Sequence, residues 1–469
     1  MGKVLSAYLS PHPPIIVEEI GKGEALKAQK TVKGCESLAK DIKKESPSTI
    51  IIITPHGPLF RDAISISFEE NLRGDFNNFG NRDLKFEFKN NLELVNKITD
   101  ESFKQDIMIA KIDRKFAKDY NISSKLDHGA LVPLYFVDKE YKGFKLIHIT
   151  YGLLPPIDLY RFGKILQEIV LESDENISLI ASGDLSHKLS NEGPYSYSPY
   201  GEQFDKKIVK LLKDGDFKSI VSFDLELSER AGECGLRSLM ILGGFLDGFN
   251  KESEVLSYEG PFGVGYCTAK FSALEKDGAK SIYEDLIKLE EEKIRDIRKE
   301  EDEYVRLARK SLEYYIEHGK IMDIPDNLSK ELLNTRRGAF VTIKKDGMLR
   351  GCIGTIEPTK KTLAQEIIQN AVSAGLRDPR FDPISEEELP SLRYSVDVLE
   401  SPEPISSIKE LDVEEYGVIV TKGFRKGLLL PNIEGVETPE EQVSIALKKA
   451  GIDEDEDYAM ERFRVVRHF

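Results

Sequence analysis

Runs of β-branched and aliphatic residues alternate with amphipathic helical patterns through the first half of the chain. The run Thr49–Thr54 is apolar at every central position, which is typical of a strand buried on both faces. Similar runs occupy residues 4–9, 145–150 and 177–182, and helical patterns occupy residues 23–44, 159–171 and 201–212. This alternation predicts an α/β domain with a central mixed sheet flanked by helices, which ends in turns and a closing strand at 259–271.

The charged stretch that follows has a different pattern. Apolar residues recur at helical spacing from Ser281 to Gly319, and Ser281 with Glu284 has the form of a capping box. Gly319 suits a helix C-terminus. We therefore expect one or two helices whose charges face solvent. The predicted organisation is a first domain at 1–275, a charged helical linker at 276–300 and a second domain at 301–469.

The second domain mixes strand and helix signals without a regular alternation. Residues 338–344 and 348–353 read as strands on either side of Asp346-Gly347, a strong signal for a hairpin turn. Thr362 and Gln365 form a second candidate capping box, which opens a helix to about Leu376. These features predict an α+β domain.

Composition and charge narrow the functional classes. A chain of 469 residues, 40% of them hydrophobic, is long enough for two domains. The net charge of −16 argues against nucleic-acid binding, which requires a basic surface, and no apolar run is long enough for a membrane span. The four cysteines, at 35, 234, 267 and 352, fit neither a disulfide framework nor a zinc ribbon, which favours the reducing cytoplasm.

Four of the seven histidines lie in turn-like segments of the first domain that contain proline or glycine. His12 and His56 follow the first two predicted strands, His187 follows a later one, and His128 lies in Asp127-His-Gly. Ligands of open α/β sheets bind outside the carboxyl ends of the strands, so the three strand-end histidines are expected to share one crevice. A single such histidine is more often structural than a ligand, but four in one domain indicate a metal site. The others are assigned to the core (His148) or to no role (His318 and His468).

The identity of the third ligand depends on one dipeptide. Imidazole and carboxylate ligands without clustered thiolates suit Fe(II), Mn(II) or Zn(II), and two histidines with one carboxylate leave positions open for substrate and dioxygen. Glu233 is the candidate carboxylate, because it lies where an apolar helix begins and a helix N-terminus keeps a carboxylate ionised. Cys234 is the alternative, and a thiolate there would favour zinc, copper or a redox role.

Several of these motifs resemble those of a known superfamily. Ser-Pro-His12-Pro, Thr-Pro-His56-Gly, Asp-His128-Gly and Ser-Gly-Asp-Leu-Ser-His187 are similar to motifs of the LigB-type catalytic subunit of class III extradiol dioxygenases, over residues 1–272. The Memo branch is the most similar, because a tyrosine-rich stretch (Tyr195, Tyr197 and Tyr200) follows the His187 motif. In residues 300–469, Leu349-Arg-Gly-Cys-Ile-Gly354 resembles the signature of the AMMECR family.

The resemblance implies roles for individual residues. His12 and His56 would ligate non-haem Fe(II), and Glu233 would supply the carboxylate, with Cys234 as the alternative ligand. His187 would be the acid–base residue and His128 would contact substrate or oxygen. A Memo-like domain joined to an AMMECR domain is the make-up of the AmmeMemoRadiSam system, so the resemblance also implies a separate radical SAM protein as partner.

Neighbouring residues have alternative interpretations. Asp184 either orients His187 or is a turn residue, and the three tyrosines either line a substrate mouth or pack within a surface loop. In the second domain, Arg350 beside Cys352 marks a candidate site, since a neighbouring cation lowers the pKa of a thiol. The alternative is a tight strand with a small buried cysteine.

Three functions follow from these observations. The first is an Fe(II)-dependent dioxygenase that inserts dioxygen into a catechol-type or related small molecule. The second is a zinc-dependent hydrolase on the same scaffold. The third is a metal-binding module that acts with a radical SAM protein.

Overall fold

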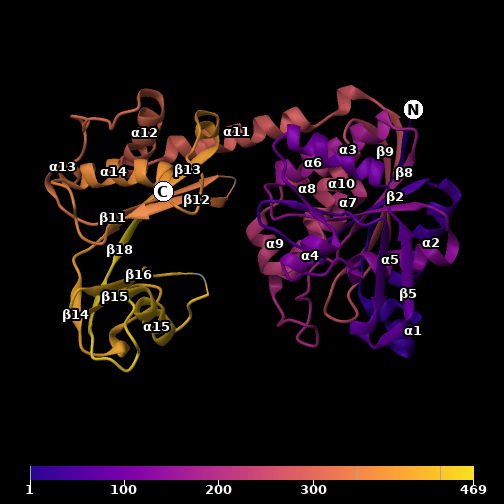
Figure 1. Ribbon diagram of the computed structural model, residues 1–469, viewed down its shortest axis with the longest axis horizontal. Coiled ribbons are helices and arrows are strands. Elements are labelled where there is room, and N and C mark those ends of the chain that lie inside the picture. The colour runs from indigo at the N-terminus through magenta and orange to yellow at the C-terminus, as the bar shows by residue number, and fades with distance from the viewer. Residues whose placement is uncertain (1, 346, 434) are drawn as a thin grey trace. The chain divides into compact units, whose positions relative to one another are not determined.

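The computed structural model describes residues 2–345, 347–433 and 435–469, and Figure 1 shows the course of the chain. The chain divides into two compact units between Ile287 and Lys288. This division falls inside helix α11 (Tyr283–Glu300), and α12 (Glu303–His318) follows after a short break. Asp302 caps α12 by accepting hydrogen bonds from the backbone N–H groups of Tyr304 and Val305, which explains why a new helix begins there.

An eight-stranded mixed sheet forms the centre of the first unit. Its strand order is β6-β3-β7-β2-β8-β1-β10-β9. In that order the strands are Ile109–Ile112, Ile64–Ser67, Lys145–Thr150, Thr49–Thr54, Asn176–Ser182, Lys3–Ser10, Tyr266–Lys276 and Phe249–Glu259. β7, β2, β8 and β1 run parallel to one another, whereas β10 and β9 are antiparallel. The predicted mixed sheet flanked by helices is confirmed.

The alternating side chains of β2 enter two different hydrophobic cores. Ile51 and Ile53 point to one face of the sheet, while Ile50 and Ile52 point to the other, because side chains alternate along a strand. All four are buried, which explains the uninterrupted apolar run in the sequence.

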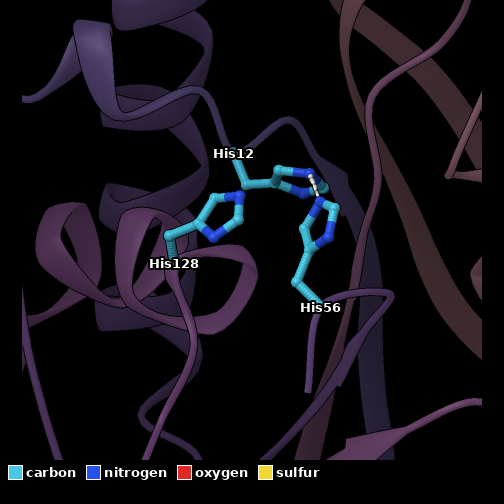
Figure 2. A group of neighbouring side chains, drawn as sticks. All are labelled: His12, His56 and His128. Atoms are coloured by element: carbon cyan, nitrogen blue, oxygen red, sulfur yellow. Dashed lines mark hydrogen bonds between the residues drawn. The ribbon is translucent and has the colours of Figure 1, made fainter. Parts of the chain in front are cut away.

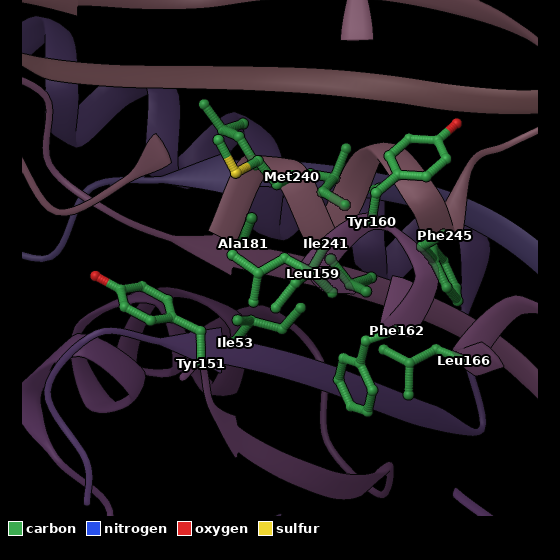
Figure 3. Close-up of a cluster of buried hydrophobic side chains, with 14 of the residues drawn as sticks. Ile53, Tyr151, Leu159, Tyr160, Phe162, Leu166, Ala181, Met240, Ile241 and Phe245 are labelled. Carbon is green, nitrogen blue, oxygen red and sulfur yellow. The ribbon is translucent and has the colours of Figure 1, made fainter. Parts of the chain in front are cut away.

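Helices cover both faces of this sheet. The core that contains Ile53 includes side chains of α3 (Leu92–Lys104), α6 (Pro156–Glu172), α7 (Pro199–Asp214) and α10 (Leu236–Phe245), and part of it is drawn in Figure 3. The other core includes α2 (Gln29–Glu45) and α5 (His128–Glu140). The unit also contains α1 (Glu18–Gly21), α4 (Arg114–Asp119), α8 (Phe217–Val221), α9 (Leu225–Ala231) and the hairpin β4–β5 (Asn71–Phe76 and Asn81–Lys89).

The second unit is α+β, as predicted. One four-stranded sheet has the order β12-β11-β13-β18 and the other β14-β17-β15-β16. The strands are β11 (Ala339–Lys345), β12 (Met348–Gly354), β13 (Leu392–Leu399), β14 (Glu403–Ile405), β15 (Gly417–Lys422), β16 (Arg425–Leu429), β17 (Ala459–Phe463) and β18 (Val465–His468). The helices besides α12 are α13 (Lys330–Asn334), α14 (Leu363–Leu376) and α15 (Pro439–Ala450).

The predicted hairpin and the predicted helix start of the second unit are confirmed where the structure describes them. β11 and β12 pair as an antiparallel hairpin, although Asp346 of the predicted turn lies outside the described residues. The side chain of Thr362 caps α14 by accepting from the backbone N–H of Gln365, as expected at this helix start. In the part of the chain that the structure describes, none of the helices combines the length and the apolar character that a bilayer crossing requires.

Truncation of one side chain of β2 tests the importance of the core that contains Ile53. Ile53→Ala removes a fully buried side chain, so the free energy of unfolding of the first unit should fall by about 2–5 kcal/mol. Urea denaturation followed by circular dichroism measures this change. Leu26→Ala, at a side chain that is 73% exposed, is the matched control. A loss below about 1 kcal/mol at Ile53 would contradict the burial of this side chain in its core.

Candidate metal centre

The carboxyl ends of three adjacent parallel strands carry three of the candidate residues. β2, β8 and β1 are neighbours, and Ser10 at the end of β1 pairs with Ser182 at the end of β8. His12 lies two residues after β1, His56 two residues after β2, and His187 five residues after β8. These histidines therefore lie at the same edge of the sheet, where the sequence predicted a crevice.

His128 reaches the same place from a helix rather than from a turn. It is the first residue of α5, and the Asp127 side chain caps that helix by accepting from the backbone N–H of Ala130. The expected turn at this position is therefore the N-terminus of a helix. The Asp-His-Gly pattern is explained by the cap, because Asp is a preferred residue before the first helical position.

The rings of His12, His56 and His128 face one another (Figure 2). One ring nitrogen from each lies within 4.8 Å of the others, and the Nε2 atoms of His12 and His56 are 2.9 Å apart. The rings of His56 and His128 are stacked, with centroids 4.3 Å apart. His12 is buried, His128 is half-buried and His56 is exposed, so the group opens to solvent on the His56 side.

The tautomer of His12 follows from its hydrogen bonds. The hydroxyl of Ser182 donates its only proton to the carbonyl oxygen of Gly129, at 2.5 Å. The same hydroxyl lies 2.9 Å from Nδ1 of His12 and must therefore accept from it. The proton of His12 is thus on Nδ1, and the lone pair of Nε2 points toward the other histidines.

This spacing fits a shared metal ion. Two imidazole nitrogens each about 2.1 Å from one metal are about 3.0 Å apart at a right angle, and about 3.4 Å apart at a tetrahedral angle. The 2.9 Å between the Nε2 atoms of His12 and His56 is close to the first value. The donor set present therefore fits a transition metal, with His12, His56 and His128 as the residues that would hold it.

Electrostatics favour neutral histidines in this group. Burial, together with the neighbouring His128, lowers the pKa of His12 well below its usual value. Packing of the rings also removes water from His56 and His128 and lowers the pKa of each, although His56 keeps an exposed edge. A neutral imidazole keeps a nitrogen lone pair that can bind a metal, so histidine ligands must be neutral.

Asp184 contacts His12 instead of the ring of His187. Its Oδ1 accepts from the backbone N–H of His12 at 2.9 Å, and its Oδ2 lies 3.8 Å from Nε2 of His12. Burial raises the pKa of Asp184 to about 6. These contacts give Asp184 a role at the His12 loop that the sequence analysis did not include, and the orientation of His187 by Asp184 stays a prediction.

Cys234 and Glu233 point in different directions. The Sγ atom of Cys234 lies 3.6 Å from Nε2 of His12 and 3.7 Å from Nε2 of His187. The carboxylate of Glu233 accepts from the hydroxyl of Ser228 at 2.6 Å and from the backbone N–H of Leu236 at 2.7 Å. Glu233 thus satisfies the N-terminus of α10, and its predicted role as a ligand stays a prediction, while Cys234 is the residue that contacts the histidines.

A close backbone approach places Cys234 in this position. A Cβ atom on Gly183 would lie 2.2 Å from the Cα atom of Gly235, which is closer than two such atoms can be. The backbone N–H of Cys234 also donates to the carbonyl oxygen of Asp184. Only a residue without a side chain lets the two loops meet in this way, so the short contact from Cys234 to His12 depends on the glycine.

Asp127 and His148 form a support that the sequence did not reveal. Nε2 of His148 lies 2.9 Å from Oδ2 of Asp127, and the hydroxyl of Thr54 donates to Oδ1 of Asp127 at 2.7 Å. Burial opposes ionisation of Asp127, but its hydrogen bond to His148 holds the pKa of this carboxyl below its usual range. The Thr54 hydroxyl in turn accepts from the backbone N–H of His56. His148 is buried as predicted, yet it also connects the core to a candidate ligand.

The tyrosines after His187 divide between the two interpretations given above. The ring of Tyr195 is stacked on His187, with centroids 5.8 Å apart and 55% of the tyrosine exposed. Tyr200 instead accepts a hydrogen bond from Arg230 through its hydroxyl. Only Tyr195 therefore contacts a candidate catalytic residue by its ring.

Arg350 and Cys352, the candidate site of the second unit, both contact neighbouring residues of that unit. Arg350 makes a bidentate ion pair with Glu388, and the backbone N–H of Cys352 donates to Asp378. The Sγ atom of Cys352 lies 3.3 Å from the hydroxyl of Thr342 on the paired strand. A special reactivity of Cys352 stays a prediction.

Comparisons with known proteins assign both units. Residues 6–269 match the family model of the catalytic LigB subunit of aromatic ring-opening dioxygenase, and residues 305–468 match AMMECR1. A protein of Clostridium acetobutylicum is 48% identical over 98% of both chains. A protein of Thermotoga maritima is 52% identical over 34% of this chain and 94% of its own length.

Solved structures give more distant likenesses. The crystal structure of an uncharacterised protein from Pyrococcus horikoshii is 34% identical, covers 35% of this chain and 88% of its own, and has a TM-score of 0.33. That of an uncharacterised protein from Escherichia coli K12 is 14% identical, covers 57% of this chain and 99% of its own, and has a TM-score of 0.37.

The buried carboxyl of Asp205, which holds the loop of His187, should make the stability of the first unit depend on pH. Asp205 accepts from the backbone N–H of Ser186 and from the hydroxyl of Tyr258, and burial raises the pKa of Asp205 to about 7. A raised carboxyl pKa stabilises the fold below the unfolded value of about 3.9, and this contribution is lost as the pH rises through the folded value. Between pH 4 and pH 8 the wild type should therefore lose about 2–4 kcal/mol of stability relative to Asp205→Asn, which stays neutral.

Urea titrations at both pH values measure this difference in the first unit. Asp214→Asn, at an exposed carboxylate, is the matched control and should follow the wild type. Parallel curves for Asp205→Asn and the wild type would contradict a buried, protonated Asp205.

Proposed function

This chain belongs to the family of the catalytic LigB subunit of aromatic ring-opening dioxygenases, and we propose that its first unit is a metal-dependent oxidoreductase acting on a small molecule with adjacent hydroxyl groups. The observation that carries the proposal is the convergence of neutral histidine nitrogens at one edge of the sheet. We assign the metal to His12, His56 and His128, with Fe(II) as the ion and zinc or copper as the alternatives. When bound, such a metal acts as a Lewis acid and brings substrate and dioxygen together.

The side chains around the group supply orientation and proton transfer. Desolvation by burial lowers the pKa of His187, so its ring is neutral near pH 7 and can accept a proton from a substrate hydroxyl. Tyr195 stacks on that ring and limits its rotation. The exposed edge of His56 is the side from which a small molecule reaches the histidines. Burial of Asp184 against His12 keeps water from the opposite side.

A second candidate function rests on Cys234. A thiol near two histidines is a strong metal-binding group once it ionises, and its pKa is raised by burial and by the nearby Asp184 when no cation is present. Such a site suits a module that retains a metal and acts together with a separate radical SAM protein. Metal affinity would then depend on Cys234, and oxygen chemistry would not be required.

Metal retention tests the shared premise of both candidates. After anaerobic loading with Fe(II) and desalting, the wild type should keep about one iron per chain, whereas His12→Ala should keep little, because it removes the buried ligand. His318→Ala, at an exposed histidine of the second unit, is the matched control. Equal iron in His12→Ala and wild type would remove the basis of the proposed site. Cys234→Ser and Glu233→Gln, loaded in parallel, distinguish the thiol from the carboxylate as a further ligand.

Oxygen uptake distinguishes the two candidates. The Fe(II)-loaded wild type should consume oxygen in the presence of catechols, and His187→Ala should lower the rate by about 10²–10⁴-fold while retaining iron, since it removes a base and no ligand. An oxygen electrode measures the rate, with His318→Ala as the control. Absence of uptake by an iron-loaded wild type across a catechol series would favour the metal-retaining module.

A further inference from the structure

A pocket of about 760 Å³ lies in the second unit, and its lining includes neither Arg350 nor Cys352, the candidate site residues of that unit. Its lining comes from the N-terminal part of α14, the loop before that helix, Arg336, and the segment 321–324. A volume of this size is typical of sites for small molecules. All of the lining residues belong to one unit.

Three cations line this pocket without an acidic partner among the described residues. They are Arg336, Lys360 and Lys361, and the single acidic residue of the lining is Asp323. Arg336 donates from Nε to the carbonyl oxygen of Lys360 and from Nη2 to that of Pro358, and none of the described residues accepts a hydrogen bond from its Nη1. A local excess of positive charge in a chain of net charge −16 runs against the general field of the protein and favours the binding of an anion.

The loop that carries the two lysines is fixed from within. Glu366 is 1% exposed and accepts from the backbone N–H groups of Thr359 and Lys360, each within 2.8 Å. It also accepts from the hydroxyls of Thr355 and Thr359. The N–H groups of the loop therefore point inward and its carbonyls point to Arg336. Little conformational entropy is lost when a ligand meets a loop already held in this way.

Another part of the pocket lining is apolar. Ile321, Met322 and Ile324 form it, and Ile321 is 46% exposed. Met322 and Ile324 pack against the core of the second unit, so this part is anchored. Ile368 of α14 extends the apolar surface. A ligand that filled the pocket would place an anionic group at the loop and a nonpolar body against these side chains.

We propose that this pocket binds a small molecule in which a phosphate group is joined to a nonpolar body. Phosphate fits better than a single carboxylate, because its three oxygens can accept from a guanidinium and two ammonium groups together. The proposal concerns the second unit alone and does not depend on the metal centre of the first.

Titration calorimetry with 1-naphthyl phosphate tests the proposal on the full chain. Chelator is present throughout, so that the phosphate cannot bind a metal in the first unit. The wild type should bind the ester more tightly than inorganic phosphate, and 1-naphthol should not bind measurably. Lys360→Gln/Lys361→Gln should weaken binding of the ester about tenfold. Its fold should persist, because Glu366 holds the loop through backbone groups and threonine hydroxyls rather than through the lysine side chains.

The matched control removes the same charge elsewhere in the unit. Lys310→Gln/Lys448→Gln changes two exposed lysines outside the pocket and should bind the ester as the wild type does. Circular dichroism melting of both double variants verifies that they fold. The proposal is overturned by a wild-type Kd above about 1 mM for the ester, by equal affinity in wild type and Lys360→Gln/Lys361→Gln, or by 1-naphthol or inorganic phosphate binding as tightly as the ester.

Discussion

The parallel pairing of β1, β8 and β2 is the constraint from which the candidate site arises. Parallel strands end at the same edge of a sheet, and these three end at nearly the same level, since Ser10 pairs with Ser182 and Ile53 with Ala181. Two residues beyond the ends of β1 and β2, His12 and His56 face one another with their Nε2 atoms 2.9 Å apart. A shift of one residue would move each side chain of β2 to the opposite face of the sheet, so the packing of the two different hydrophobic cores holds this register.

The site holds ionisable side chains that burial shifts toward their neutral forms. Burial keeps His12 neutral and raises the pKa values of Asp184 and Cys234, all in contact with one another. A cation placed among them would offset the cost of ionising the carboxyl and the thiol. The same arrangement explains why the supporting residues are hydrogen-bonded so completely. Ser182 fixes the tautomer of His12, while Asp127 and Thr54 fix the backbone of His56.

Much of this arrangement could be predicted from the sequence, because it depends on local patterns. The apolar run Thr49–Thr54 and the turn that follows it predict both a central strand and the place of His56. The link from His148 to Asp127 could not be predicted, since a histidine inside an apolar strand looks the same whether it is isolated or hydrogen-bonded across the sheet. The choice between Glu233 and Cys234 also lay outside the local pattern.

That choice depends on contacts between distant segments. The direction of Cys234 is set by the approach of its loop to Gly183, about fifty positions earlier in the chain. Glu233 meets both conditions that the sequence suggested, an apolar helix start and a nearby histidine motif. Its carboxylate also accepts from the backbone N–H of Leu236 in α10, and its role as a ligand stays a prediction. A helix N-terminus attracts a carboxylate whether or not a metal is nearby, so the local signal is the same for a cap and for a ligand.

The hydrogen bond from the His12 backbone N–H to Asp184 also bears on the order in which the chain folds. These two residues are separated by 172 positions, and β1 pairs with β8 over a similar span, so this pairing closes a very long loop. Contacts of such high order form after the local helices and hairpins. The histidines therefore come together only when the sheet is nearly complete, and a nascent chain leaving the ribosome offers a passing metal ion isolated imidazoles rather than a finished site.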